Sequence, residues 1–291
     1  MDATVECVNS INQNFNNDKV IIIVDNNSPN GSGKDLSELY QDKENIIILR
    51  NLHNQGYARG LNTGIAYAKE HYSFDFIILL NNDTEIYGMN WDSTIHDKFN
   101  EYKFHVLGPD IIALDNSHGN PMVEKINGVP DLIKIMGTQL IDIVINFLYL
   151  KKFTDNMKSF IKKLIRYHKP DLRIIDQDNL NVQLHGSCLI LSKLFFEKQE
   201  GLYGDTFLYY EEEILRYLAK RDNLLLMYTP QIRLIHKEGL ATKCDLGTYR
   251  KKEIFFNKHS FQSCRIFLRL MLSDRKSEHH NRSQRVHHSD A

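Results

Sequence analysis

With 291 residues, the chain is long enough for one large α/β domain or two small ones, and its 42% hydrophobic and 25% charged residues are ordinary for a soluble globular protein. The formal net charge of −1 gives no overall attraction to nucleic acid, which we exclude as a partner. Four widely spaced cysteines lack zinc-site spacing, no signal peptide is visible, and no apolar run reaches the length of a membrane span. We therefore expect a cytoplasmic protein with reduced thiols.

The first 80 residues alternate between strand and helix patterns. Runs of branched apolar residues indicate buried strands, and periodic apolar residues between them indicate helices. The expected strands are 20–24, 46–49 and 76–80, and the expected helices are 4–11, 36–40 and 54–69. This alternation is the signature of a parallel sheet with crossover helices, so it predicts a Rossmann-like nucleotide fold.

The third strand organises the rest of the prediction. Its five apolar residues, 76–80, suit a parallel strand buried on both faces, and it ends abruptly at Asn81, Asn82, Asp83 and Thr84. Ligands bind at the carboxyl ends of such strands, so an aspartate there can contact substrate. Its oxygens suit a Mg²⁺ or Mn²⁺ ion that is also coordinated by substrate phosphates. Taken alone, the pattern favours an Asx-turn that simply ends a strand.

Six motifs, in their order along the chain, resemble one enzyme family. They are residues 24–28 (VDNNS), 54–64 (NQGYARGLNTG), 80–84 (LNNDT), 185–188 (HGSC), 207–213 (FLYYEEE) and 236–242 (HKEGLAT). They are similar to family 2 glycosyltransferases of the GT-A fold, and most of all to the rhamnosyltransferase-like branch of bacterial surface-polysaccharide enzymes. The resemblance covers about residues 1–114 and 181–270.

The resemblance implies a Rossmann-like GT-A fold, in which helices flank a mixed, mostly parallel sheet. It divides the chain into a nucleotide-sugar-binding half at 1–114, a variable helical insertion at 115–180, an acceptor and catalytic half at 181–245 and a helical element at 246–272. The polar remainder, 273–291, is predicted to be disordered.

One departure from the family concerns the start of the fold. Family members begin with a strand that supplies part of the nucleotide-base pocket, and Met1 falls just beyond that point. The resemblance thus predicts a sheet without its usual first strand, which leaves a neighbour's backbone groups unpaired unless another segment substitutes. A late recorded start, a truncated chain and a degraded homologue are the alternatives.

The resemblance implies an inverting, metal-dependent glycosyltransferase of the hexosyltransferase type in cell-surface polysaccharide biosynthesis. Its donor would be a dTDP- or UDP-sugar, with rhamnose as one option, and its acceptor a glycan or lipid-linked saccharide. Mn²⁺ or Mg²⁺ would neutralise the charge that builds on the leaving diphosphate. Asp83 and His236 are the expected metal ligands, and Asn81 stands where the family's motif often has its first aspartate. The competing function is an N-terminally truncated, non-catalytic nucleotide-sugar-binding or scaffolding homologue.

Nine residues are expected to bind the donor. Asp25 matches the family position that contacts base or ribose, and it equally suits the cap of the turn before Pro29. Arg59 suits the diphosphate or a solvated position, and the glycines spaced one turn apart in 54–64 suit close approach to nucleotide or sheet. The set is Asp25, Asn27, Asn54, Gly56, Arg59, Asn81, Asn82, Gly186 and Ser187.

A general base must take the proton of the acceptor hydroxyl, and a carboxylate does this well once its pKa rises among neighbours. The resemblance implies a base within the acidic run 211–213, where Glu212 aligns with the family's catalytic aspartate. Because glutamate is one methylene longer than aspartate, Glu211 and Glu212 both remain candidates. The same acids also suit the first turn of a helix.

Residues 153–166 combine apolar residues at helical spacing with several basic residues and one acid, Asp155. Such a helix suits the surface of an anionic membrane, which would make the protein peripheral on the inner face of the plasma membrane. It equally suits packing on its own domain or on a second subunit of a homo-oligomer. A helical C-terminal element is expected over 249–271.

Overall fold

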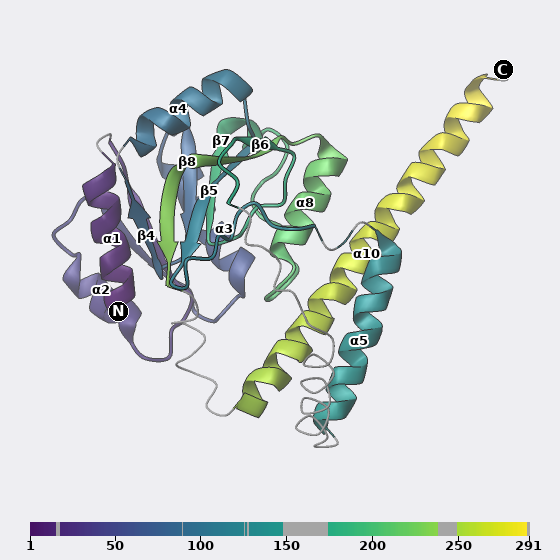
Figure 1. The fold of residues 1–291 in the computed structure, drawn as a ribbon, viewed down its shortest axis with the longest axis horizontal. Helices are drawn as coiled ribbons and strands as arrows, with labels where there is room; N and C mark the ends of the chain where they lie inside the picture. The colour runs from purple at the N-terminus through teal and green to yellow at the C-terminus, as the bar shows by residue number, and fades with distance from the viewer. Residues whose placement is uncertain are drawn as a thin grey trace. The chain divides into compact units, whose positions relative to one another are not determined.

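A computed structural model describes residues 1–15, 18–88, 90–124, 126, 128–147, 174–237 and 249–289 (Figure 1). The chain divides into two compact units. The sheet unit consists of Met1–Glu124, Pro170–Phe207 and Glu211–Asp245. The helical unit consists of Lys125–Lys169, Leu208–Tyr210 and Leu246–Ala291.

The sheet unit opens with a helix and a parallel pair of strands. Its first elements are α1 (Asp2–Asn14), β1 (Ile21–Asp25), α2 (Ser32–Leu39), β2 (Ile46–Arg50) and α3 (Tyr57–His71). β1 and β2 pair in parallel, and α3 packs on β1. A Cβ atom at Gly64 would lie 3.2 Å from Val24 Cγ2, so glycine brings α3 close to the strand. The predicted strand and helix order and the packing role of Gly64 are confirmed.

A larger sheet holds six strands in the order β3-β7-β5-β8-β4, and β6 also pairs with β8. The strands are β3 (Phe76–Leu80), β4 (Thr84–Tyr87), β5 (Val106–Ala113), β6 (Asn179–Leu180), β7 (Cys188–Ser192) and β8 (Leu226–His236). Among these described strands only β5 and β8 pair in parallel. The prediction of a mostly parallel sheet is therefore wrong. The reason is that β7 inserts antiparallel between β3 and β5 and needs no crossover helix to do so.

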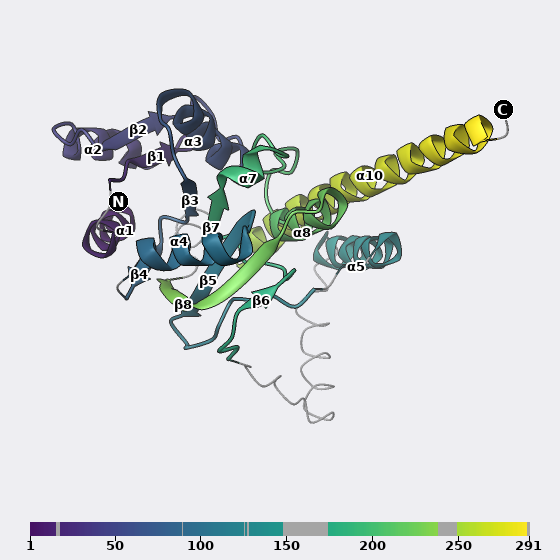
Figure 2. The ribbon, with the colours of Figure 1, turned by 90° about the horizontal axis from the view of Figure 1, so that it is seen from above.

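Strand β3 differs from expectation in a second way. It lies at an edge of the larger sheet, pairs antiparallel with β7, and only Leu79 of its five residues is buried. It is not a strand enclosed between parallel neighbours, because no described strand pairs with its other edge. Within the same described residues β1 pairs only with β2, so the sheet is divided between β1 and β3 (Figure 2).

Both faces of the larger sheet are covered by apolar clusters. Leu189 and Leu191 of β7 belong to one cluster, while Cys188 and Ile190 belong to the other, because alternate residues of a strand point to opposite faces. The first cluster includes α3 and α8, and the second includes α4 with its fully buried Trp91. The covering helices are α4 (Trp91–Tyr102), α7 (Lys193–Phe196) and α8 (Glu211–Asp222). The acidic run 211–213 thus starts a helix that is anchored in the core.

The described part of the helical unit is built on two helices, α5 (Val129–Phe147) and α10 (Tyr249–Ser289), which run antiparallel (Figure 1). The Cys264 thiol lies 3.7 Å from the carbonyl oxygen of Leu132. Further along α5, Gln139 Nε2 donates to Ser260 Oγ at 2.7 Å. Later residues of α5 therefore meet earlier residues of α10, as an antiparallel pair requires.

Helix α10 runs well beyond its expected end at 272. The predicted disorder of the tail is not found in 273–289, where the helix continues to Ser289 because no proline or glycine interrupts it. The basic amphipathic segment 153–166 lies outside the described residues. Of the helices that are described, none combines the length and the apolar character that crossing a bilayer requires.

Candidate functional site

Asp25 holds the turn after β1. Its Oδ1 accepts the Ser28 N–H at 2.9 Å, and the residue is only 8% exposed. A Cβ atom at Gly33 would lie 1.9 Å from Asp25 Oδ2, so glycine is required where α2 approaches this carboxylate. The turn-capping role of Asp25 is confirmed, and its contact with a nucleotide stays a prediction.

Asn26, which the sequence did not single out as a site residue, ties this turn to the loop before α3. Its Oδ1 accepts Asn51 Nδ2 at 3.0 Å and the Gln55 N–H at 3.1 Å. Its Nδ2 donates to Asn54 Oδ1 at 3.1 Å and to the Gly56 carbonyl at 2.9 Å. One amide thus fixes the whole loop, since it offers both donors and acceptors. The sequence feature that could have indicated this role is the pair Asn26 and Asn27 directly after the end of β1.

Gly56 fixes the entry into α3. Its φ of 87° is in the left-handed region, and a Cβ atom there would lie 2.4 Å from the carbonyl oxygen of Phe207. The Tyr57 N–H donates to that same oxygen at 2.9 Å. One turn later, Arg59 pairs with Asp205 at 3.3 Å. The start of α3 is therefore fastened to the loop before α8, and Arg59 is engaged there.

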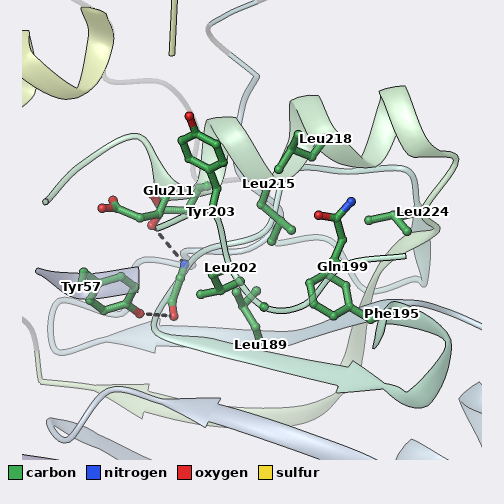
Figure 3. A pocket seen from close by; sticks show the side chains of 13 residues that line it. Tyr57, Leu189, Phe195, Gln199, Leu202, Tyr203, Glu211, Leu215, Leu218 and Leu224 are labelled. Carbon is green, nitrogen blue, oxygen red and sulfur yellow. Dashed lines mark hydrogen bonds between the residues drawn. The ribbon is translucent and has the colours of Figure 1, made fainter. Parts of the chain in front are cut away.

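The hydroxyl of Tyr57 connects the two halves of the site (Figure 3). It lies 2.9 Å from Asn81 Oδ1 and 2.7 Å from the carbonyl oxygen of Gly186, and it has one hydrogen to share between them. Burial, followed by the charges of Glu212 and Glu211, raises the pKa of Tyr57, so the hydroxyl stays neutral. The sequence did not reveal this role, although Tyr57 lies within the motif 54–64.

The two expected metal ligands, Asp83 and His236, lie together. Asp83 Oδ1 is 3.2 Å from His236 Nε2, and the residues are 6% and 7% exposed. The β4–β8 register explains this, because Thr84 lies opposite His236 and carries the turn after β3 to the end of β8.

This pair fits a divalent cation as two of its ligands. A carboxylate oxygen and an imidazole nitrogen are both donors that Mn²⁺ accepts. In addition, His236 Nδ1 is buried without a hydrogen-bond partner, so the ring is not committed to another polar contact. No three His, Cys, Asp or Glu side chains in the described part of the chain gather into a metal site. Substrate oxygens and water would therefore have to complete the coordination.

The segment before β7 brings a backbone amide to an acid of α8. Gly186 N–H donates to Glu212 Oε1 at 3.1 Å, and the Ser187 carbonyl accepts the Asn81 N–H at 2.9 Å. The Ser187 side chain is buried, with its hydroxyl 3.0 Å from His185 Nδ1. Gly186 thus contacts Tyr57 and Glu212 directly, while Ser187 holds the segment through its contacts with Asn81 and His185.

Glu211 and Glu212 line one pocket together with Tyr57 and Gly186 (Figure 3). Its other walls are largely apolar, formed by Leu189, Phe195, Leu202, Leu215, Leu218 and Leu224. Burial raises the pKa of Glu211 to about 7, and the charges of Glu212 and Glu213 add to the rise. A backbone hydrogen bond and the Thr206 hydroxyl at 3.4 Å oppose it. A carboxyl group that titrates near neutrality suits proton transfer at pH 7.

Two expected donor contacts lie apart from this network. Asn27 is exposed, with a left-handed φ of 63°. Asn82 is also exposed, and its Nδ2 donates to Thr4 Oγ1 on α1 at 3.1 Å. Their binding roles stay predictions.

Comparison with known proteins agrees with this arrangement. Residues 2–155, more than half of the chain, match the profile of glycosyl transferase family 2. The low-salt glycan biosynthesis hexosyltransferase Agl10 of Haloferax volcanii is 25% identical over 221 residues, which are 75% of this chain and 58% of Agl10. The chain thus spans somewhat more than half of that relative's length.

Among solved structures, the crystal structure of GalNAc-T7 with UDP, GalNAc and Mn²⁺ is similar, with a TM-score of 0.51 and 14% identity. The match covers 80% of this chain and 41% of that one. At this identity the likeness shows the fold, an α/β arrangement with a mixed sheet as in GT-A glycosyltransferases.

Proposed function

Because the chain belongs to glycosyl transferase family 2, we propose that it is an inverting, metal-dependent hexosyltransferase. It moves a sugar from a nucleotide-diphosphate donor to a glycan or lipid-linked saccharide. The observation that carries the proposal is a series of hydrogen bonds from Asn81 through the Tyr57 hydroxyl and Gly186 to Glu212, which starts two residues before Asp83 and its partner His236. It links the two groups that sugar transfer requires, a place for a leaving diphosphate and a carboxylate for an acceptor.

On the donor side, Asp83 and His236 would hold Mn²⁺ or Mg²⁺. When bound, the cation supplies positive charge against the negative charge that builds on the leaving diphosphate. Asn81 adds no charge, because its side chain is a neutral amide. Its Oδ1 accepts the Tyr57 hydroxyl, and its backbone N–H donates to the Ser187 carbonyl.

On the acceptor side, Glu212 is the proposed base. The Gly186 N–H fixes one carboxylate oxygen, which orients the other. The acceptor hydroxyl gives its proton to Glu212 as its oxygen bonds the anomeric carbon, and the diphosphate leaves with the electron pair of the broken C–O bond. Glu211 is the alternative base, because its pKa of about 7 also suits this proton transfer.

The donor is proposed to be a dTDP- or UDP-sugar, with rhamnose among the candidates. The work of the enzyme is proposed to be cell-surface polysaccharide assembly, from the cytoplasm or the inner face of the plasma membrane. The name of Agl10, a glycan-biosynthesis hexosyltransferase, supports the reaction class.

Calorimetry with Mn²⁺ and a panel of dTDP- and UDP-sugars, followed by transfer assays with the sugar that binds, tests the proposal. Glu212→Gln should lower kcat/KM about 10²-fold or more, the range for loss of a catalytic acid–base group. Asp83→Ala should also strongly lower it, because it removes a proposed ligand of the cation. Glu70→Gln, an exposed change on α3, is the matched control. Near-normal transfer in either site variant would remove that residue from its role.

The competing function is a non-catalytic nucleotide-sugar-binding or scaffolding homologue. Donor binding without transfer to any acceptor in the panel would support this alternative against the enzyme.

A further inference from the structure

Helix α5 of the helical unit carries an exposed apolar stripe. Successive residues of an α-helix turn by about 100°. Measured from Leu132, which is buried against α10, four exposed apolar residues lie within about 80–180° in one rotational sense. They are Ile133, Leu140, Ile141 and Val144, with exposed fractions of 57%, 53%, 60% and 48%. The acids of the helix, Asp131 and Asp142, fall in the opposite sense.

Helix α10 carries an exposed cationic stripe. Ser260 and Cys264 contact Gln139 and Leu132 of α5, so they define the face towards that helix. Measured from Cys264, four exposed basic residues fall within about 100–140°, and two exposed apolar residues lie at about 80°. The basic residues are Lys258, Arg265, Arg269 and Lys276, and the apolar ones are Ile254 and Leu272. Asp274, the sole acid in the sequence from 254 to 277, falls in the opposite sense.

The two stripes lie on the same side of the pair. In an antiparallel pair, residues displaced in the same rotational sense from the packed faces emerge on one common side. The opposite side is occupied by the segment Leu208–Tyr210, since the Tyr209 ring packs on Phe256 and the Leu208 carbonyl accepts Ser263 Oγ at 2.7 Å. The side with the stripes, called here the docking face, thus combines apolar residues of both helices with a row of cations and excludes the acids.

We propose that the docking face binds the surface of an anionic lipid bilayer. Apolar side chains beside a row of Lys and Arg are the pattern of helices that lie in a membrane interface, where the cations meet anionic headgroups. A second copy of the chain is the poorer occupant, because face-to-face pairing would oppose one cationic row with another. The proposal rests on the helical unit alone and does not depend on the proposed reaction.

Flotation of the full chain with lipid vesicles tests this. The chain should float with vesicles of phosphatidylcholine containing about 30% phosphatidylglycerol, and about tenfold less with phosphatidylcholine alone. Raising the salt from about 0.1 M to 0.5 M should weaken the association, because it screens the cations.

Two variants separate the components of the face. Arg265→Glu with Arg269→Glu, and separately Leu140→Asp, should each reduce flotation with anionic vesicles about tenfold. The matched controls lie on the sheet unit: Lys43→Glu with Lys193→Glu for charge, and Leu52→Asp, 95% exposed, for the apolar change. Circular dichroism of each variant checks that it folds.

Three outcomes would overturn the proposal. The first is a wild-type chain that does not associate with anionic vesicles. The second is a pair of face variants that float as well as their controls. The third is light scattering that shows a dimer in the wild type and a monomer in Leu140→Asp, which would assign the face to a second copy of the chain.

Discussion

Replacing Glu211 by glutamine tests the electrostatics of the proposed catalytic acids without any substrate. Burial and the neighbouring charges raise the pKa of Glu211 from its ordinary 4.5 to about 7 in the folded chain. A folded-state pKa above the unfolded value means that the folded chain holds this proton more tightly. The contribution of Glu211 to stability is therefore fully present below about pH 4.5 and is lost as the pH rises through 7.

The size of the effect follows from the two pKa values. At about 1.4 kcal/mol per pH unit, a rise from 4.5 to about 7 corresponds to about 3–4 kcal/mol as an upper limit. Solvent reaches part of the side chain, so we expect about 1–3 kcal/mol. Glutamine keeps the shape and can accept the Thr206 hydroxyl, but it does not ionise. Relative to wild type, Glu211→Gln should therefore gain this amount of stability between about pH 5 and pH 8.

Fluorescence of Trp91 provides the assay, because it is the single tryptophan of the chain and is buried in the sheet unit. Denaturant unfolding of both chains at several pH values gives the difference in the free energy of unfolding, in which titrating groups that do not interact with Glu211 cancel. Glu70→Gln on the exposed side of α3 is the control. Glu212→Gln should flatten the pH dependence in part, since its charge contributes to the rise. A difference between Glu211→Gln and wild type that does not change with pH would refute the reasoning.

Two further substitutions test the framework around the site. Gly56→Ala should cost about 2–4 kcal/mol of unfolding free energy, because it combines a left-handed φ with a Cβ atom 2.4 Å from the Phe207 carbonyl oxygen. The control is Gly88→Ala, which has a φ of 92° but no atom within 4 Å of the added Cβ and should therefore cost less. Equal costs in denaturant unfolding would show that the chain relaxes the contact with Phe207. Lys98→Met should cost about 3–5 kcal/mol of unfolding free energy, because it leaves Asp178, its partner at 2.5 Å, largely buried without a countercharge. Adding Asp178→Leu should recover most of this free energy. A double variant as unstable as Lys98→Met would contradict the pairing.

The elements of the first 80 residues could be predicted because each depends on local pattern. Branched apolar runs gave β1, β2 and β3 nearly to the residue, and Asn26 to Ser28 marked the turn that Asp25 caps. The pairing of those strands could not be predicted in the same way. β3 pairs with β7, more than a hundred residues later, and its apolar run carries no information about the direction of that partner.

The candidate site shows the same division. Asp83, Glu211 and Glu212 could be predicted only through the family resemblance, because their local patterns alone favour an Asx-turn and the first turn of a helix. Tyr57 and Asn26 could not, because their importance comes from contacts with distant segments. The docking face is a further case. Its cationic residues stand seven, eleven and eighteen positions after Lys258, a spacing that has meaning only once α10 is known to be one unbroken helix.

The contacts of Asn81 give a physical reason for the amide at the place where the family's motif often carries an aspartate. Its Oδ1 accepts the Tyr57 hydroxyl, and the pKa of that hydroxyl is already raised by burial, followed by the charges of Glu212 and Glu211. A carboxylate at 81 would place a further negative charge beside this buried hydroxyl. A neutral amide keeps the hydrogen bond without that charge. In the proposed mechanism, Asp83 for the cation and the acids Glu211 and Glu212 for proton transfer are thus separated by a neutral Tyr57–Asn81 hydrogen bond.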